Sequence, residues 1–140
     1  YARVGHVNSG FTEGGDVLAT FNAPVITLDA AIRRFGAPAF CKIDVEGWEV
    51  EVLKGLSHPI PLVSFEFQLG DYGIKKTQDC LKELARFGSA RANITPAETL
   101  RFHLPDWMTL NDMLAWFPGD LKKTLPGDFY GDIFVKLDAA

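Results

Sequence analysis

A change of hydrophobic period between residues 39 and 56 constrains this chain more than any other feature. Residues 39–45, AFCKIDV, form a nearly unbroken apolar run, which is typical of a strand covered on both faces. From Trp48 the apolar residues follow helical spacing instead. The predicted inward side of this helix carries Val52, Leu53 and Leu56, and its outward side carries Glu49, Glu51 and Lys54. A buried strand that leads directly into an amphipathic helix indicates an α/β fold.

A second strand and helix follow the first pair. LVSFEFQL at 62–69 predicts another buried strand, and residues 77–87 predict a helix that stops at Gly88. The apolar side of that helix carries Cys80, Leu81, Leu84 and Ala85. Because the links are short, the two strands are expected to be parallel and joined by a crossover. Upstream, Thr27 is the predicted N-cap of a short helix that ends at Gly36.

The last third of the chain has a different pattern. Residues 90–95 and 100–104 have the composition of strands, and Thr109 is expected to cap a short helix that ends at Pro118. Residues 129–137, FYGDIFVKL, predict a final strand. Because little helix precedes this strand, an antiparallel orientation is favoured over a parallel crossover.

The length of 140 residues suits a single domain, for which we predict a loop-rich beginning at 1–24 and a core at 25–140. A net charge of -4, without a basic run, argues against nucleic acid as a partner. The apolar runs are too short to span a bilayer, and no signal-peptide pattern starts the chain. We therefore expect no membrane partner and a cytoplasmic location.

Three carboxylates fall near the ends of the two predicted parallel strands. Asp44 and Glu46 close the first strand, and Glu66 lies near the end of the second. Ligands of open α/β sheets bind beyond the carboxyl ends of strands, so these side chains are expected to share one rim. Such a cluster suits a general base, a divalent cation or a cationic ligand, and the sequence leaves these three roles open. Gly47 allows a sharp turn or a close approach to a ligand.

Structural roles are alternatives for several of these residues. Asp44 and Glu46 precede the predicted helix, so either can instead act as its N-cap or interact with the helix dipole. Glu66 lies between two phenylalanines, where an unpaired charge is costly, so it requires a partner or a water-filled cleft. Lys42 is expected to pair with a nearby acid, and Trp48 either packs or walls a ligand pocket. Scattered histidines and two distant cysteines predict no metal site.

The segment KIDVEGWEVEVLKGL, residues 42–56, resembles the signature of the FkbM-type methyltransferase family, in which K-I-D-V-E-G-x-E leads into a helix that ends in L-x-G. VITLDAAI resembles the family's upstream helix start, LVSFEFQ its next strand and CLKELARFG the following helix. GDFYGDIFVKL resembles its closing strand. The resemblance covers residues 24–137.

The resemblance implies an S-adenosylmethionine-dependent O-methyltransferase. The implied fold is a three-layer, Rossmann-like sheet of the class I methyltransferase type, mostly parallel, with a final antiparallel strand inserted beside the fifth. Asp44, Glu46 and Glu66 would be the catalytic residues that position or deprotonate a hydroxyl of a small molecule or sugar. Asp44, Gly47 and Trp48 would contact S-adenosylmethionine.

One part of the family pattern has no counterpart in this sequence. The glycine-rich cofactor loop of the first strand and the acids of the second and third strands do not match, and SGFTEGGD at 9–16 resembles no phosphate-binding loop. We therefore predict the C-terminal, acceptor-side half of the domain, in which most of the cofactor site is absent and whose activity requires the missing N-terminal half.

Two alternatives belong to other functional classes. The first is a non-catalytic α/β module that pairs with itself, as a homodimer, or with a partner through an exposed sheet edge. The second is a cation site on a hydrolase-like domain, against which the sequence lacks G-x-S-x-G.

Overall fold

The computed structural model describes residues 23–97, 99–121, 123 and 129–138. Most of the predicted loop-rich beginning at 1–24, including SGFTEGGD and its possible edge strand, lies outside the described residues. In chain order the elements are α1 (Leu28–Phe35), β1 (Phe40–Ile43), α2 (Glu49–Lys54), β2 (Leu62–Gln68), α3 (Asp71–Ala85), β3 (Ala90–Pro96), β4 (Met108–Thr109), α4 (Leu110–Trp116), the π-helix η1 (Phe117–Leu121) and β5 (Tyr130–Leu137). These elements confirm the α/β class.

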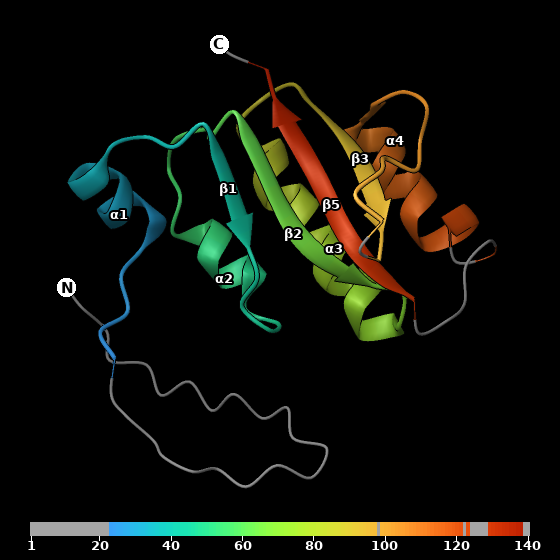
Figure 1. Ribbon diagram of the computed structural model, residues 1–140, viewed down its shortest axis with the longest axis horizontal. Helices are drawn as coiled ribbons and strands as arrows, with labels where there is room; N and C mark the ends of the chain where they lie inside the picture. Colours follow the sequence, from blue (N-terminus) through green and yellow to red (C-terminus); the bar gives the residue numbers. More distant parts are fainter. Residues whose placement is uncertain (1–22, 98, 122, 124–128, 139–140) are drawn as a thin grey trace, which may run out of the picture.

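The strands form one mixed sheet in the order β1-β2-β5-β3-β4 (Figure 1). β1 and β2 are parallel, whereas β5 is antiparallel to both β2 and β3. The predicted antiparallel final strand is therefore confirmed, and it is inserted beside β2. The same insertion changes the expected mostly parallel sheet: β1, β2 and β3 share one direction, but the described strands contain a single parallel ladder, β1–β2.

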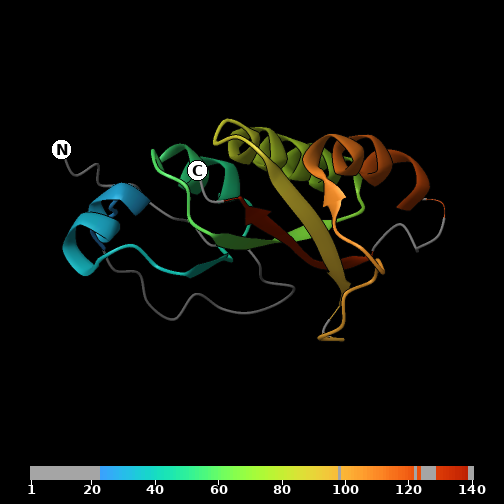
Figure 2. The ribbon, with the colours of Figure 1, turned by 90° about the horizontal axis from the view of Figure 1, so that it is seen from above.

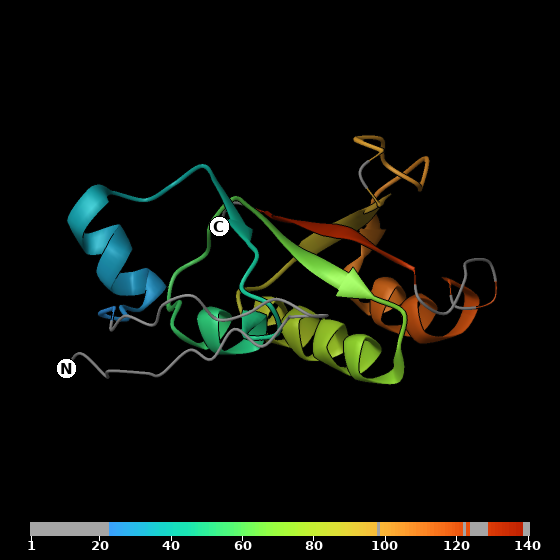
Figure 3. The same ribbon diagram turned by 60° about the horizontal axis from the view of Figure 1, so that its bottom comes forward.

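Helices α2, α3 and α4 lie on one face of the sheet (Figure 2). Helix α1 lies beyond the β1 edge and is tied to the end of α2, where Asp29 N donates to Gly55 O at 3.0 Å (Figure 3). Helices α2, α3 and α4 thus form a single layer against the sheet, and the predicted third layer is not seen among the residues described. No described helix is both long enough and apolar enough to cross a membrane.

The core lies between the sheet and these helices. Side chains alternate along β2, so Val63, Phe65 and Phe67 face the helical layer and are fully buried. Phe67 meets Phe117 of η1 edge to face, with ring centroids 5.1 Å apart. The alternate residues Glu66 and Gln68 point towards the opposite face of the sheet.

The expectation that β1 is covered on both faces is wrong. Only Ile43 is buried, Cys41 is half-buried, and Phe40 remains 46% exposed. In the described part of the chain β1 pairs with β2 alone, and the helices cover one face of it. An apolar run therefore does not by itself show that both faces of a strand are covered.

Four further predictions need correction. The helix predicted at 77–87 begins at Asp71, because its first turn is held against β2 by tertiary packing. Residues 100–104 are not a strand. The helix capped by Thr109 does not stop at Pro118, because the chain continues through η1. Ala85, predicted to face inward, is exposed.

Candidate functional site

A pocket of about 150 Å³ lies where β1 and β2 end and α3 begins. The turn after β1 contributes Glu46 and Gly47, and β2 contributes Glu66 and Gln68. The helices complete the lining with Glu49, Tyr72 and Lys76. Both strands are parallel, so their carboxyl ends meet at this edge, as the sequence predicted.

The pocket brings together part of the predicted site. Glu46, Gly47 and Glu66 line it, whereas Asp44 and Trp48 do not. Asp44 is exposed, and Trp48 is 54% exposed at the start of α2. Roles for these last two residues stay predictions.

The turn between β1 and α2 has an unusual backbone. Glu46 has φ of 50° and Gly47 has φ of 98°, and Trp48 N donates to Val45 O at 3.3 Å. Two successive positive φ values are those of a type I′ turn, which glycine adopts without cost. Glu46 carries a Cβ and pays for this conformation, and such strain is concentrated at functional sites.

A buried ion pair forms the inner wall of the pocket. Lys76 Nζ lies 2.9 Å from Glu49 Oε2, and the two side chains are only 7% and 1% exposed. Gly47 N donates to the other carboxylate oxygen, Oε1, at 3.2 Å. The contact with Lys76 is an ion pair rather than a well-directed hydrogen bond, because Oε2 has no hydrogen-bond partner of good geometry among the described atoms.

The prediction that Glu49 faces outward is therefore wrong. Burial raises the pKa of Glu49, but the Lys76 ammonium and the backbone N–H groups of Glu49 and Gly47 outweigh it, so the pKa of this carboxyl lies below its usual value. Helical period alone could not identify the pair, since α3 supplies the partner. The available signal was the position of Glu49 as the last acid of K-I-D-V-E-G-x-E.

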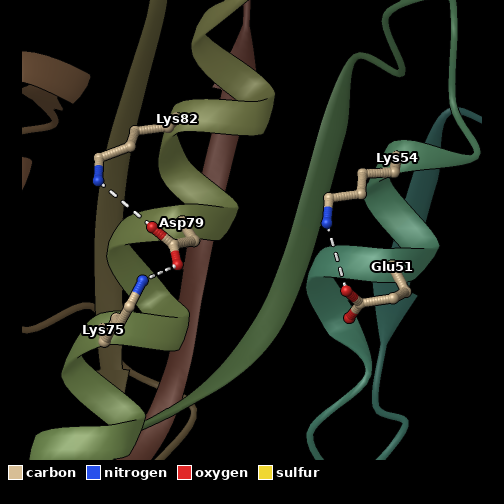
Figure 4. Close-up of polar contacts among 5 residues, drawn as sticks. All are labelled: Glu51, Lys54, Lys75, Asp79 and Lys82. Atoms are coloured by element: carbon tan, nitrogen blue, oxygen red, sulfur yellow. Dashed lines mark hydrogen bonds and ion pairs between the residues drawn. The ribbon is translucent and has the colours of Figure 1, made fainter.

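Ion pairs on the outer surface of the same helices differ from this one (Figure 4). They join Lys75 and Lys82 to Asp79 at 2.6 and 3.3 Å, and Lys54 to Glu51 at 3.3 Å. Exposed pairs of this kind contribute little, typically about 0–1 kcal/mol, because water screens them. The pocket pair is desolvated, so loss of one partner there has a much larger effect.

Glu66 has the partner that its apolar surroundings required. Gln68 Nε2 donates to Glu66 Oε1 at 2.9 Å, and Glu66 is half-buried. Across the sheet Glu66 is opposite Asp132 of β5, whose carboxylate forms an ion pair with Lys42. The expected pairing of Lys42 with a nearby acid is thus confirmed.

A second hollow, of about 270 Å³, is lined by β3, β5 and the loop that follows β3. Its lining is mostly apolar, with Asp132 as its one carboxylate, and consists of Thr95, Ala97, Leu100, Phe102, Asp132 and Phe134. Phe102 meets Phe134 edge to face, with centroids 5.5 Å apart. Asp132 is the cross-strand partner of Glu66, which lines the first pocket.

The described residues contain no group of three or more side chains able to hold a metal ion. Cys41 and Cys80 are free thiols. Burial, reinforced by the negative charge of Glu49, raises the pKa of Cys80 to about 12. Cys80 is therefore an inert core residue rather than a nucleophile.

The charges around the first pocket favour particular ligands. Three carboxylates, those of Glu46, Glu49 and Glu66, face one ammonium, that of Lys76, which leaves two negative charges. Glu49 already pairs with Lys76 and accepts a hydrogen bond from Gly47 N, so Glu46 and Glu66 are the acids available to contact a ligand. Carboxylates in this arrangement accept a proton from a hydroxyl or attract a cationic group.

Comparison with known proteins gives one match. A family model described as Methyltransferase FkbM domain matches residues 2–117. The matched range includes every residue that lines the first pocket and ends before β5. No curated protein and no solved structure matches the chain.

Proposed function

Because this chain belongs to the FkbM methyltransferase domain family, we propose that it takes part in methyl transfer from S-adenosylmethionine to a hydroxyl of a small molecule or sugar. The observation that carries the proposal is the pocket that joins Glu46 and Glu66 at the ends of two parallel strands. The family suggests a methyltransferase, and the two acids suit an acceptor that loses a proton.

Glu66 is the proposed base. Its Oε1 is oriented by Gln68, which leaves the second carboxylate oxygen for the acceptor hydroxyl. A positioned base contributes about 10²- to 10⁴-fold to the rate. Glu46, on the turn opposite, accepts a hydrogen bond from the acceptor or stabilises positive charge near it.

The cofactor fits the pocket only in part. S-adenosylmethionine supplies, when bound, an electrophilic methyl group on a cationic sulfur. The negative charge of the pocket suits this end, but sites for drug-sized ligands measure about 300–1,000 Å³, so a pocket of about 150 Å³ holds the reacting groups and not the whole cofactor. Gly47 would lie at the reacting end, and the exposed Asp44 and Trp48 would contact the part that extends beyond it.

Calorimetric titration of the 140-residue chain with S-adenosylmethionine and S-adenosylhomocysteine tests the proposal. Micromolar binding of the sulfonium supports the proposal, and Glu46→Gln is then expected to weaken that binding about tenfold or more, because a negative charge beside the sulfonium is lost. Glu51→Gln is the matched control, since Glu51 lies on the outer side of α2 and pairs with Lys54. Absence of binding at millimolar ligand, with the chain shown to be folded, refutes cofactor binding by this chain.

The acceptor role needs a separate measurement. With cofactor bound, Glu66→Gln is expected to lower kcat at least about 100-fold while leaving cofactor affinity within about threefold. A Glu66→Gln variant with wild-type kcat would exclude Glu66 as the base. Hydroxylated sugars and small alcohols are the first acceptors to screen.

Self-association is the second candidate function, and the β1 edge favours it. In the described part of the chain β1 pairs with β2 alone, and Phe40 on that strand is 46% exposed. An unpaired apolar edge promotes strand pairing between copies. Sedimentation velocity of the wild type and of Phe40→Lys tests this: a concentration-dependent dimer that the variant abolishes supports it, and a monomer in both excludes it.

A further inference from the structure

We propose that Lys76 is a positioning residue for this pocket: by holding Glu49, it fixes the turn that carries Glu46. The functional meaning rests on the proposed methyl-transfer site, whereas the mechanical claim stands on contacts alone. Neither Lys76 nor Glu49 was among the site residues predicted from the sequence.

The contacts form a continuous connection from α3 to the turn. Lys76 Nζ is 2.9 Å from Oε2 of Glu49. The other oxygen of the same carboxylate, Oε1, accepts from Gly47 N at 3.2 Å. One carboxylate thus joins the helix after β2 to the backbone directly after Glu46.

Helix α3 is a rigid support for this connection. Gly73 packs so closely on β2 that an added Cβ would lie 2.4 Å from Gln68 O. Lys76 is three residues further on and shares the buried side of the helix with Gly73. The sheet therefore determines where the ammonium lies, and the ammonium determines where Glu49 lies.

The turn needs such a hold because its conformation is unfavourable for Glu46. With φ of 50°, Glu46 has a backbone that residues with a Cβ rarely adopt. Val45 O and Glu49 Oε1 accept from the N–H groups of Trp48 and Gly47, which close the turn from both sides. Without Glu49, the turn relaxes and Glu46 leaves the pocket.

A structural role alone would be the simpler explanation, so the test separates stability from positioning. Lys76→Met leaves Glu49 buried without its cation and is expected to unfold part of the chain. The double variant Glu49→Leu with Lys76→Met replaces the pair by apolar groups of similar size, which generally preserves stability. This double variant stays folded but has no acceptor for Gly47 N.

Nuclear magnetic resonance of the ¹⁵N-labelled chain provides the readout. In the double variant we expect the amide of Gly47 to exchange at least about tenfold faster, the factor for a lost hydrogen bond to a charged acceptor. The three-bond scalar coupling between HN and Hα of Glu46 depends on the backbone angle φ. In the double variant it is expected to change to a value typical of negative φ. Lys75→Met, which removes the exposed neighbour of Lys76, is the matched control and should change neither signal.

The two proposals fail in different ways. Unchanged signals of Glu46 and Gly47 in a folded double variant overturn the positioning role, whatever the wild type binds. Faster exchange of Gly47 together with at least about tenfold weaker S-adenosylhomocysteine binding supports it, since small misplacements in a site are costly. Faster exchange in a chain whose wild type binds no cofactor supports the positioning of the turn and refutes the proposed function alone.

Discussion

Replacing Gly73 with alanine tests the closest backbone approach beside the pocket. The new Cβ would lie 2.4 Å from Gln68 O and 2.8 Å from Gln68 Cβ, whereas ordinary contacts of this kind are 3.4–4 Å. Neither atom is the end of a flexible side chain, so α3 and β2 must move apart by about 1 Å. Overpacking of this kind costs about 1–3 kcal/mol.

A smaller term opposes the clash. Alanine is better than glycine inside a helix by about 1 kcal/mol, and less than that in the first turn, where Gly73 lies. The net loss of unfolding free energy is therefore about 1–2 kcal/mol. Because the clash falls on Gln68, which orients the proposed base Glu66, kcat is expected to fall as well.

Urea denaturation followed by tryptophan fluorescence measures the loss, with the m-value checked for constancy. Gly119→Ala is the control, because among the described residues, its two chain neighbours aside, no atom lies within 4 Å of its added Cβ. That variant should be unchanged or up to about 1 kcal/mol more stable. A Gly73→Ala chain as stable as the wild type would show that α3 does not approach β2 as closely as described.

Three further predictions follow from named contacts. The pKa of Glu49 is lowered in the folded chain, so its pair contributes stability above the unfolded pKa of about 4.3 and loses it as the pH falls through the folded pKa. Urea denaturation from about pH 7 to about pH 3 should then show a steeper loss for the wild type than for Glu49→Gln, and equal slopes would contradict this. Iodoacetamide at about pH 8 should alkylate the half-buried Cys41 well before Cys80, because Cys80 is buried and its pKa is raised to about 12. Mass spectrometry measures the two alkylation rates, and equal rates would exclude a buried Cys80. Thr109→Ala removes an oxygen that accepts from Asp112 N at 3.2 Å, and a loss of about 1 kcal/mol is expected in thermal or urea unfolding, against no loss if the cap is not formed.

Local signals accounted for much of the fold. Thr27 caps α1 by accepting from Ala30 N at 3.2 Å, and the chain leaves that helix at Gly36 with φ of 92°. Both features depend on residues within a few positions, so the sequence could specify them. β2 and β5 were identified in the same way, from short apolar segments between breakers.

The candidate site was predicted less completely. Glu46, Gly47 and Glu66 meet as expected, because parallel strands bring their carboxyl ends to one edge. Lys76 and Tyr72 were missed, since the start of α3 was placed six residues late, at Thr77 instead of Asp71. A glycine at position 73 weakens the helical pattern, and its reason is the packing on Gln68.

The sequence by itself determined the order of the elements from α1 to β3, the caps of α1 and α4, and the placement of acids where two strands end. Only the tertiary structure decided that β1 is half-exposed, and that Glu49 is buried against Lys76 instead of facing water. The physical reason is one of range. Backbone hydrogen bonding and hydrophobic period act between near neighbours, whereas the burial of a charge depends on the side chain that a distant element brings to meet it.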